Sequence, residues 1–319
     1  MRNVIRDLRS DGFSVCVVTS IRHAQATDNG STFEDFLNLQ GVPLLVTSTL
    51  DIEKLIQFCP DVNERIAISI GAPWVIGKEL IETYFSSKLL NLHGTGLPKN
   101  RGGGGFSWQI LTRNRFGFST LHVIDAGVDT GPILARAEFL YSSQCRIPAD
   151  YENEYVQKSS EFLCNFLRNI KYEPITVKSM KQATELSTYW PRLLTDVSGW
   201  IDWSLRVDQL ENFICAFDDP YLGASTTLNN RRVHIKKVSI NYQDGFAHPF
   251  QFGIVYRKSE SWLCVAANQG GLIIEQLESP LGEDLLSDFR VGDRFITPQE
   301  TLESAKRRVI WGPSVASFD

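Results

Sequence analysis

The chain has 319 residues, of which 43% are hydrophobic and 22% charged, and its formal net charge is −5 at pH 7. This length suffices for two domains, and the net negative charge argues against a nucleic-acid-binding protein, whose surface is normally basic. No window approaches the ~18 uncharged apolar residues of a membrane span. The charged start MRNVIRDLRSDGF is neither a signal peptide nor an anchor, so we expect a cytoplasmic protein.

In chain order, a predicted helix is followed by alternating apolar and amphipathic runs. Strands are predicted at residues 14–20, 42–48, 65–71 and 87–93, with helices near 31–40, 50–58 and 77–86. The turn DAGVDTG then separates two more predicted strands, and a long helix follows, at residues 118–124, 132–139 and about 150–171. This alternation is typical of βαβ units in a mainly parallel sheet covered on both faces. The predicted class of this half is α/β.

The opening helix is unusual, because an open α/β domain normally begins with a strand. Either the start is truncated relative to its relatives, or the sheet has one strand fewer.

The second half changes in character. Residues 172–204 are irregular and contain proline and tryptophan, and a helix is predicted at 205–217. Short, evenly spaced strands follow, which indicates a small barrel or sandwich. The predicted division is a first domain over residues 1–180, a linker over 181–204 and a barrel-like domain over 205–319.

The six cysteines are scattered, with no CxxC spacing. We expect reduced, buried thiols in preference to disulfides or a zinc site, and no metal is predicted.

A candidate site lies at the end of the fourth predicted strand, in NLHGTGLPKNRGGGGFSW. Residues two apart on a strand share a face, so the side chains of Asn91 and His93 are expected side by side. Ligands bind at the carboxyl ends of strands in open α/β sheets, and glycines let the backbone approach a ligand closely. A structural histidine beside a flexible linker is the alternative for this stretch.

The turn DAGVDTGPIL supplies the second half of the candidate site. For Asp125 an ordinary turn, in which the carboxylate bonds its own backbone, is an adequate interpretation. Asp129 can reach Asn91 and His93 if the two strands are neighbours.

Together these motifs resemble the 10-formyltetrahydrofolate-dependent formyltransferases, closest to the branch that holds the amino-sugar N-formyltransferases and the methionyl-tRNA formyltransferases. The resemblance places the family's Asn-x-His on Asn91 and His93, its catalytic Asp on Asp129 and a supporting histidine on His122. It implies a Rossmann-like catalytic domain. The stretch from Gly199 to Ile235 resembles the start of the family's C-terminal, OB-like barrel, which forms a second domain.

The resemblance implies one-carbon transfer from 10-formyltetrahydrofolate, as co-substrate, to a primary amine. Asn91 and His93 would donate hydrogen bonds to the developing oxyanion, and Asp129 would act as the base if burial raises its pKa. His122 would support the Asp129 turn. By position, the folate pocket is expected to include Trp74, Val75, Ile76, Ile124, Asp125, Ala126 and Val128.

Two positions depart from the family pattern. HGTGLP stands where the family has HPSLLP, and Gly105 stands where it has proline. Both changes are expected to loosen the loop without touching the three catalytic positions.

Three hypotheses concern the amine: a nucleotide-linked amino sugar, methionyl-tRNA, or none, in a non-catalytic folate-binding relative. A tRNA enzyme must neutralise phosphates, but residues 205–319 hold 12 Lys and Arg against 15 Asp and Glu. The charges therefore favour the small sugar over nucleic acid. Dimers are common among such relatives, which makes a homodimer one option.

Overall fold

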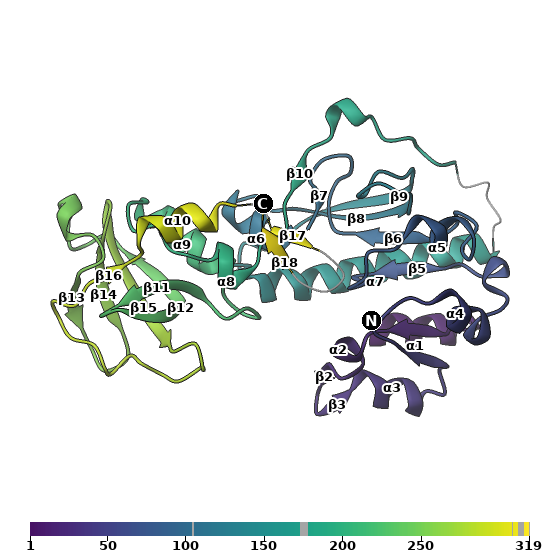
Figure 1. Cartoon of the computed structure of the whole chain (residues 1–319), viewed down its shortest axis with the longest axis horizontal. Helices are drawn as coiled ribbons and strands as arrows, with labels where there is room; N and C mark the ends of the chain where they lie inside the picture. The colour runs from purple at the N-terminus through teal and green to yellow at the C-terminus, as the bar shows by residue number, and fades with distance from the viewer. Residues whose placement is uncertain (104, 173–177, 308, 312–315, 319) are drawn as a thin grey trace. The chain divides into compact units, whose positions relative to one another are not determined.

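The computed structural model describes residues 1–103, 105–172, 178–307, 309–311 and 316–318. The chain divides into two compact units (Figure 1). The first unit comprises Met1–Gly102, Phe116–Leu140 and Glu154–Tyr189, and the second comprises Gly103–Arg115, Tyr141–Asn153 and Trp190–Asp319. The predicted boundaries at residues 180 and 205 stay a prediction.

The first unit holds the alternating strands and helices. Its first hundred residues form α1 (Arg2–Ser10), β1 (Val17–Thr19), α2 (Ile21–Ala24), β2 (Thr27–Asp28), β3 (Ser31–Thr32), α3 (Phe33–Leu39), β4 (Leu44–Val46), α4 (Ile52–Phe58), η1 (Val62–Glu64), β5 (Ile68–Ile70), α5 (Lys78–Glu82), β6 (Leu90–His93) and β7 (Arg101–Gly102). Later segments add β8 (Phe116–Val123), β9 (Ile133–Leu140), most of α7 (Pro148–Tyr172) and η2 (Thr184–Leu186). Each predicted strand and helix of this half is confirmed, and most are shorter than predicted.

Strand pairing in the first unit is mixed. β1 pairs with β4 and β5 with β6 in parallel, whereas β6 pairs with β8 and β8 with β9 antiparallel. The strand order of the larger sheet is β5-β6-β8-β9. The predicted α/β, Rossmann-like class is confirmed. The expectation of a mainly parallel sheet is wrong for the larger sheet, because β8 runs antiparallel to both β6 and β9.

Helices cover the sheet through apolar faces. Val4 and Leu8 of α1 pack with Leu90 and Leu92 of β6 and with Leu163 of α7. Burying such side chains contributes about 1.5–3 kcal/mol each. The opening helix predicted from the sequence is therefore part of the core that supports β6.

The second unit is built around a closed sheet. Its elements are α6 (Gly105–Leu111), the start of α7, β10 (Tyr189–Trp190, from Trp190), α8 (Thr195–Ser198), α9 (Val207–Ala216), β11 (Ala224–Leu228), β12 (Arg231–Asn241), η3 (Pro249–Gln251), β13 (Val255–Lys258), β14 (Leu263–Ala267), β15 (Gly270–Glu278), β16 (Phe295–Ile296), α10 (Gln299–Ala305), β17 (Val309–Trp311) and β18 (Ala316–Phe318). The order β13-β14-β15-β12-β11-β16 is closed by a bridge between Ile254 and Arg294. The predicted barrel-like domain is confirmed.

Within the described ranges, no helix is both long and apolar enough to span a bilayer. In the same residues no three His, Cys, Asp or Glu side chains gather in a way that could hold a metal ion. The six cysteines are free thiols.

Candidate active site

Strand β6 carries two polar side chains among buried leucines. Leu90 and Leu92 are buried, while Asn91 and His93 alternate with them and share the opposite face. The parallel neighbour β5 and the antiparallel neighbour β8 hold β6 in the interior of the sheet. The expected pairing of Asn91 and His93 on one face is therefore present.

The register of β8 places a second histidine beside Asn91. His122 lies directly opposite Asn91 across the β6–β8 ladder, and it is only 2% exposed. Its Nδ1 donates to the Val123 carbonyl at 2.9 Å, and its Nε2 lies 3.2 Å from Nδ2 of Asn91. The carbonyl can only accept, so Nδ1 of His122 carries a proton.

The turn between β8 and β9 brings Asp129 to the same place. Its Oδ1 lies 3.7 Å from Nδ1 of His93 and 3.6 Å from Nε2 of His122. The Gly102 N–H donates to Oδ2 at 2.9 Å. The three residues predicted as catalytic thus form one cluster, and their catalytic roles remain predictions.

The environment favours a neutral His93 beside an ionised Asp129. Burial lowers the pKa of His93, and the attraction of Asp129 does not offset this. Burial alone would raise the pKa of Asp129, but the two imidazole rings and the Gly102 N–H outweigh burial and hold that pKa below its usual range. The prediction that burial raises the pKa of Asp129 is therefore wrong for this structure, because the carboxylate is hydrogen-bonded as well as buried.

One polar atom of the cluster is unsatisfied. Nε2 of His93 is buried and bonds to no group in the described part of the chain. A buried polar atom without a partner is costly and uncommon. A hydrogen-bonding ligand atom at this position would satisfy it.

The residues predicted for folate binding lie in two segments of the first unit. Trp74, Val75 and Ile76 lie between β5 and α5, and Ile124, Asp125, Ala126 and Val128 lie in the β8–β9 turn. Val75 is 83% exposed and Val128 60% exposed. Nε1 of Trp74 donates to the Ser48 carbonyl at 2.9 Å, and Ile76 packs on a core cluster. Their role in folate binding stays a prediction.

Asp125 is engaged within its own turn. Its Oδ1 accepts from the Gly127 N–H at 3.1 Å and from the Thr130 hydroxyl at 2.5 Å. This confirms the interpretation of Asp125 as a turn residue that bonds its own backbone.

The glycines after His93 are surrounded by aromatic rings. A Cβ at Gly96 would lie 2.9 Å from the Phe118 ring, and one at Gly94 would lie 3.5 Å from the Tyr155 ring. The Phe118 ring occupies the space of a side chain at Gly96, whereas a Cβ at Gly94 would be in ordinary van der Waals contact with Tyr155. The expectation that these departures loosen the loop stays a prediction. At Gly105 no atom lies within 4 Å of a Cβ, so that position is open.

Sequence reasoning missed two residues that contact the Asp129 turn. The side chain of Gln182 bonds the turn's backbone, and Arg101 bonds Gln182. Arg101 lies in the RGGGG motif, which drew attention only to its glycines. Gln182 lies in an irregular segment with no periodic pattern, so only a three-dimensional structure could find it.

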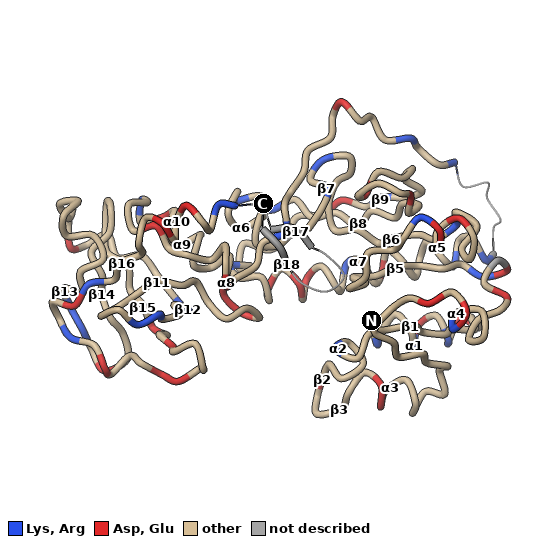
Figure 2. The backbone as a smooth tube through the Cα atoms, viewed as in Figure 1, with Lys and Arg blue, Asp and Glu red and all other residues tan. Residues whose placement is uncertain are grey.

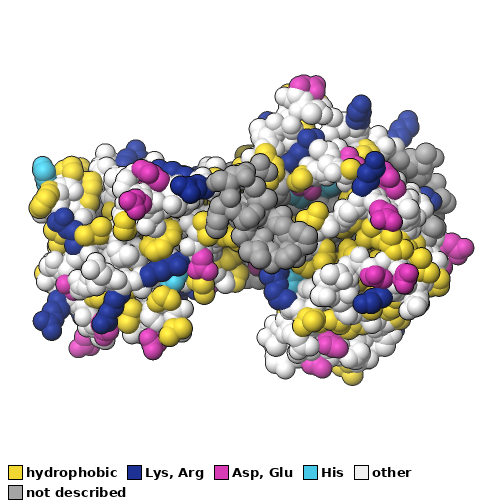
Figure 3. All heavy atoms as spheres, in the orientation of Figure 1, with side chains coloured by type: hydrophobic (Ala, Val, Ile, Leu, Met, Phe, Trp, Pro, Cys, Tyr) yellow, Lys and Arg dark blue, Asp and Glu magenta, His cyan; other side chains and the backbone are white. Residues whose placement is uncertain are grey.

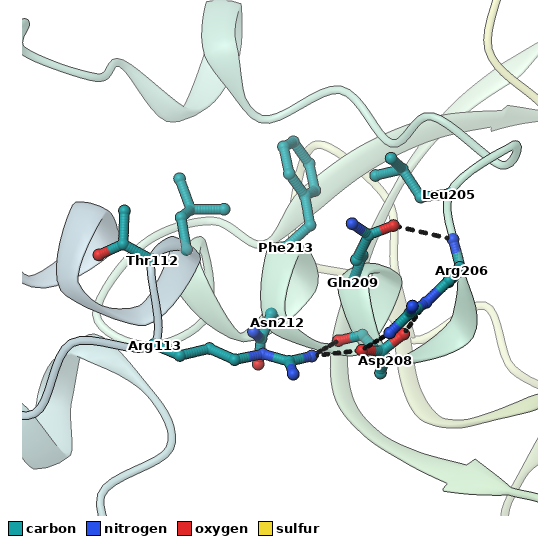
Figure 4. A pocket seen from close by; sticks show the side chains of 9 residues that line it. Thr112, Arg113, Leu205, Arg206, Asp208, Gln209, Asn212 and Phe213 are labelled. Atoms are coloured by element: carbon teal, nitrogen blue, oxygen red, sulfur yellow. Dashed lines mark hydrogen bonds and ion pairs between the residues drawn. The ribbon is translucent and has the colours of Figure 1, made fainter.

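The second unit contains a separate cavity of about 440 Å³ between the end of α6 and the start of α9 (Figure 4). Arg113 and Arg206 both point at Asp208, with distances of 2.6 and 2.7 Å. Asp208 is thus paired with both arginines, and none of the predicted site residues lines this cavity.

The fold and the site together define a class of protein. An α/β unit with Asn91, His93 and Asp129 clustered beside the sheet, and a second unit that closes into a barrel, has the architecture of the two-domain formyltransferases.

Comparisons with known proteins agree with this class. The family described as "Formyl transferase, C-terminal domain" matches residues 194–286. A methionyl-tRNA formyltransferase of Ruminiclostridium cellulolyticum is 23% identical over 84% of both chains. An N-formyltransferase structure from Helicobacter canadensis, in complex with folinic acid and dTDP-3-aminofucose, superposes with a TM-score of 0.64 at 19% identity and covers 86% of this chain and 95% of its own.

A sugar 3N-formyl transferase, crystallised in the presence of dTDP and 5-N-formyl-THF, superposes with a TM-score of 0.61 at 19% identity, covering 86% of this chain and 93% of its own. These structural likenesses establish the fold. The sequence match to a formyl transferase C-terminal domain covers residues 194–286, which lie in the second unit.

Proposed function

We propose that the chain transfers a formyl group from 10-formyltetrahydrofolate to the amine of a nucleotide-linked amino sugar, in the synthesis of N-formyl sugars for surface polysaccharides. The observation that carries this proposal is the cluster of Asn91, His93 and Asp129, in which Nε2 of His93 is buried without a partner. Formyl-folate as donor is supported by relatives crystallised with 5-N-formyl-THF, folinic acid and tetrahydrofolic acid.

The residues of the cluster suit the chemistry. The folate supplies the formyl group. The amide of Asn91 and a ring N–H of His93 can donate to the formyl oxygen as negative charge develops, a contribution of about 3 kcal/mol per donor. Asp129, ionised at neutral pH, would accept the proton that the amine loses as it bonds the formyl carbon, directly or through a water molecule, and return it to N10 of the folate as the N10–formyl bond breaks.

The choice of amine is supported by charge. Acidic and basic residues are mixed along the strands of the second unit (Figure 2) and are interspersed on the visible face of each unit (Figure 3). With 12 Lys and Arg against 15 Asp and Glu over residues 205–319, the barrel half carries an excess of acids. A small substrate needs no extended basic surface, whereas tRNA does.

Methionyl-tRNA is the second candidate, because several curated relatives at 23–27% identity are named methionyl-tRNA formyltransferases. A non-catalytic folate-binding role is the third, and the complete Asn-His-Asp cluster argues against it.

The test is an assay of tetrahydrofolate release from 10-formyltetrahydrofolate with a panel of nucleotide-linked 3- and 4-amino sugars and, in parallel, methionyl-tRNA. Turnover with one sugar and none with tRNA is expected. Turnover with tRNA alone would overturn the sugar assignment, and no turnover with any amine would favour the non-catalytic role.

Replacing Asp129 tests the catalytic assignment. Asp129→Asn keeps the shape but removes the base, so we expect kcat to fall by about 10²–10⁴-fold while folate binding, measured by calorimetry, stays within about threefold. Asp7→Asn removes an exposed carboxylate of α1 and is the matched control. Full activity in Asp129→Asn would remove Asp129 from the mechanism.

A further inference from the structure

Gln182 is a buried amide whose hydrogen-bonding groups are all engaged. It is 6% exposed, and its Nε2 donates to the carbonyls of Asp129 at 2.9 Å and of Gly131 at 2.7 Å. Its Oε1 accepts from Nε of Arg101 at 3.2 Å and from Nη2 at 2.8 Å. One side chain thus connects the backbone of the Asp129 turn to Arg101.

The backbone of Asp129 needs such a restraint. Asp129 has φ 53°, in the left-handed region that non-glycine residues adopt at a cost. Gly131 is also constrained, because a Cβ there would lie 1.9 Å from the Val123 carbonyl oxygen. The turn therefore directs two inward carbonyls at one place, and Gln182 supplies both donors that they require.

The segment that carries Arg101 also holds the Asp129 side chain. The Gly102 N–H, next along the chain from Arg101, donates to Oδ2 of Asp129 at 2.9 Å. The Arg101 N–H donates to the Thr188 carbonyl at 2.9 Å, and the Asn100 N–H donates to the Thr188 hydroxyl at 2.8 Å. Residues 100–102 are thus hydrogen-bonded to Thr188, in the segment that follows Gln182.

These contacts close a ring: Gly102 holds the carboxylate, Gln182 holds the peptide, and Arg101, 8% exposed, joins the two. We propose that Arg101 and Gln182 are positioning residues that keep Asp129 in its left-handed conformation and thereby aim its carboxylate at the reacting amine. The proposal rests on the proposed formyl transfer. Neither residue touches the reacting atoms; both act through Asp129.

The substitution Gln182→Glu separates positioning from packing. Glutamate keeps the shape and still accepts from Arg101, but as a carboxylate it cannot donate to the carbonyls of Asp129 and Gly131. It also adds a negative charge beside Asp129. The titratable and charged groups around Asp129 are His93, His122 and Arg101, with Asp125 engaged in its own turn.

We expect kcat of Gln182→Glu to fall by about 100-fold, because misplacing a catalytic group by about 1 Å has that effect. The KM for 10-formyltetrahydrofolate should stay within about threefold. The carboxylate of Asp129, followed by NMR with ¹³C-labelled aspartate and assigned with Asp129→Asn, should titrate at higher pH than in the wild type, because the new negative charge disfavours its ionisation. Gln157→Glu adds the same charge on the exposed face of α7 and should change neither quantity.

A kcat within twofold of wild type, or an unshifted Asp129 titration in a folded Gln182→Glu, would overturn the proposal. If Gln182→Glu fails to fold, Arg101→Lys tests the ring instead: it retains the positive charge but loses the two-pronged contact with Oε1, and kcat should fall with KM unchanged. Equal kcat in that variant would likewise overturn the proposal. If the wild type turns over no amine, the proposed function fails, and the Asp129 titration in Arg101→Lys, which adds no charge, tests the positioning: it should still move to higher pH.

Discussion

His93 and Asp129 lie 3.7 Å apart, yet their surroundings act on their charges in opposite ways. For His93 the cost of burial exceeds the attraction of Asp129 and the contact with the Asn100 backbone, so the pKa of His93 is lowered. Asp129 has in addition a direct hydrogen bond from the Gly102 N–H, which favours its anion. In the proposed reaction His93 would be the neutral donor, and Asp129 would be a base whose pKa is lowered and not raised as expected.

The protonation of His93 can be tested directly. Because burial lowers its pKa from the ordinary 6.5, we expect His93 to be mainly neutral at that pH. The ring signals of His93, assigned by NMR with His93→Gln, should show less than half protonation at pH 6.5. A ring mainly protonated at this pH would show that the attraction of Asp129 exceeds the cost of burial.

The same shift predicts the pH dependence of stability. Below pH 6.5 the unfolded chain binds a proton at His93 before the folded chain does, so the free energy of unfolding should fall as the pH drops through that range. Asp129, with its pKa below 3.8, stabilises the fold above that value and loses this contribution as the pH falls further. Urea unfolding should show a smaller loss below pH 6.5 in His93→Gln than in the wild type.

The conformation of the loop after β6 depends on packing between segments that are distant in the chain. The ring of Phe118 in β8 occupies the space that a side chain at Gly96 would need. Arg136 of β9 stacks on the same ring and bonds the Leu97 carbonyl at 3.1 Å. The loop that follows the candidate site is therefore held by β8 and β9.

Replacing Gly96 should show this coupling. Gly96 has no positive φ, so Gly96→Leu meets a steric cost of about 1–3 kcal/mol from the Phe118 ring and little backbone strain. Phe118→Ala should relieve it, so the double variant should be more stable than the sum of the single changes by about 1 kcal/mol or more. Urea unfolding of the four proteins measures this, and additivity within about 0.5 kcal/mol would contradict it.

For the whole molecule, charge governs the expected choice of substrate. The chain has 32 Lys and Arg against 37 Asp and Glu. Several of the barrel's basic groups are engaged: Lys236 bonds Asp219 at 2.6 Å, and Arg232 bonds Asp196 at 3.1 Å. Basic side chains that are already paired offer less attraction to phosphates.

Binding to tRNA should therefore be weak. We expect a Kd no tighter than about 10⁻⁵ M at 0.15 M salt, as for nonspecific association, and a shallow dependence on salt. Fluorescence anisotropy with labelled initiator tRNA at two salt concentrations measures both. A submicromolar Kd with a steep slope would show a basic surface assembled by the tertiary structure and would favour the tRNA substrate.

Much of the fold and the core of the site could be predicted from local patterns. The two-residue period of a strand placed Asn91 and His93 on one face, and turn chemistry explained Asp125. The contacts of Gln182 and the ring that fills the space at Gly96 could not be predicted, because each joins segments far apart in the chain. The direction of the Asp129 pKa shift depended in the same way on the Gly102 N–H.

The sequence by itself determined the element types, the order of the two halves and the identity of the Asn, His and Asp side chains, because propensity, periodicity and turn residues act over a few neighbours. The tertiary structure alone decided that β8 runs antiparallel to β6, that Asp129 is held left-handed by Gln182 and that its pKa is lowered. Strand register, burial and hydrogen bonds between distant segments exist only once the chain has folded.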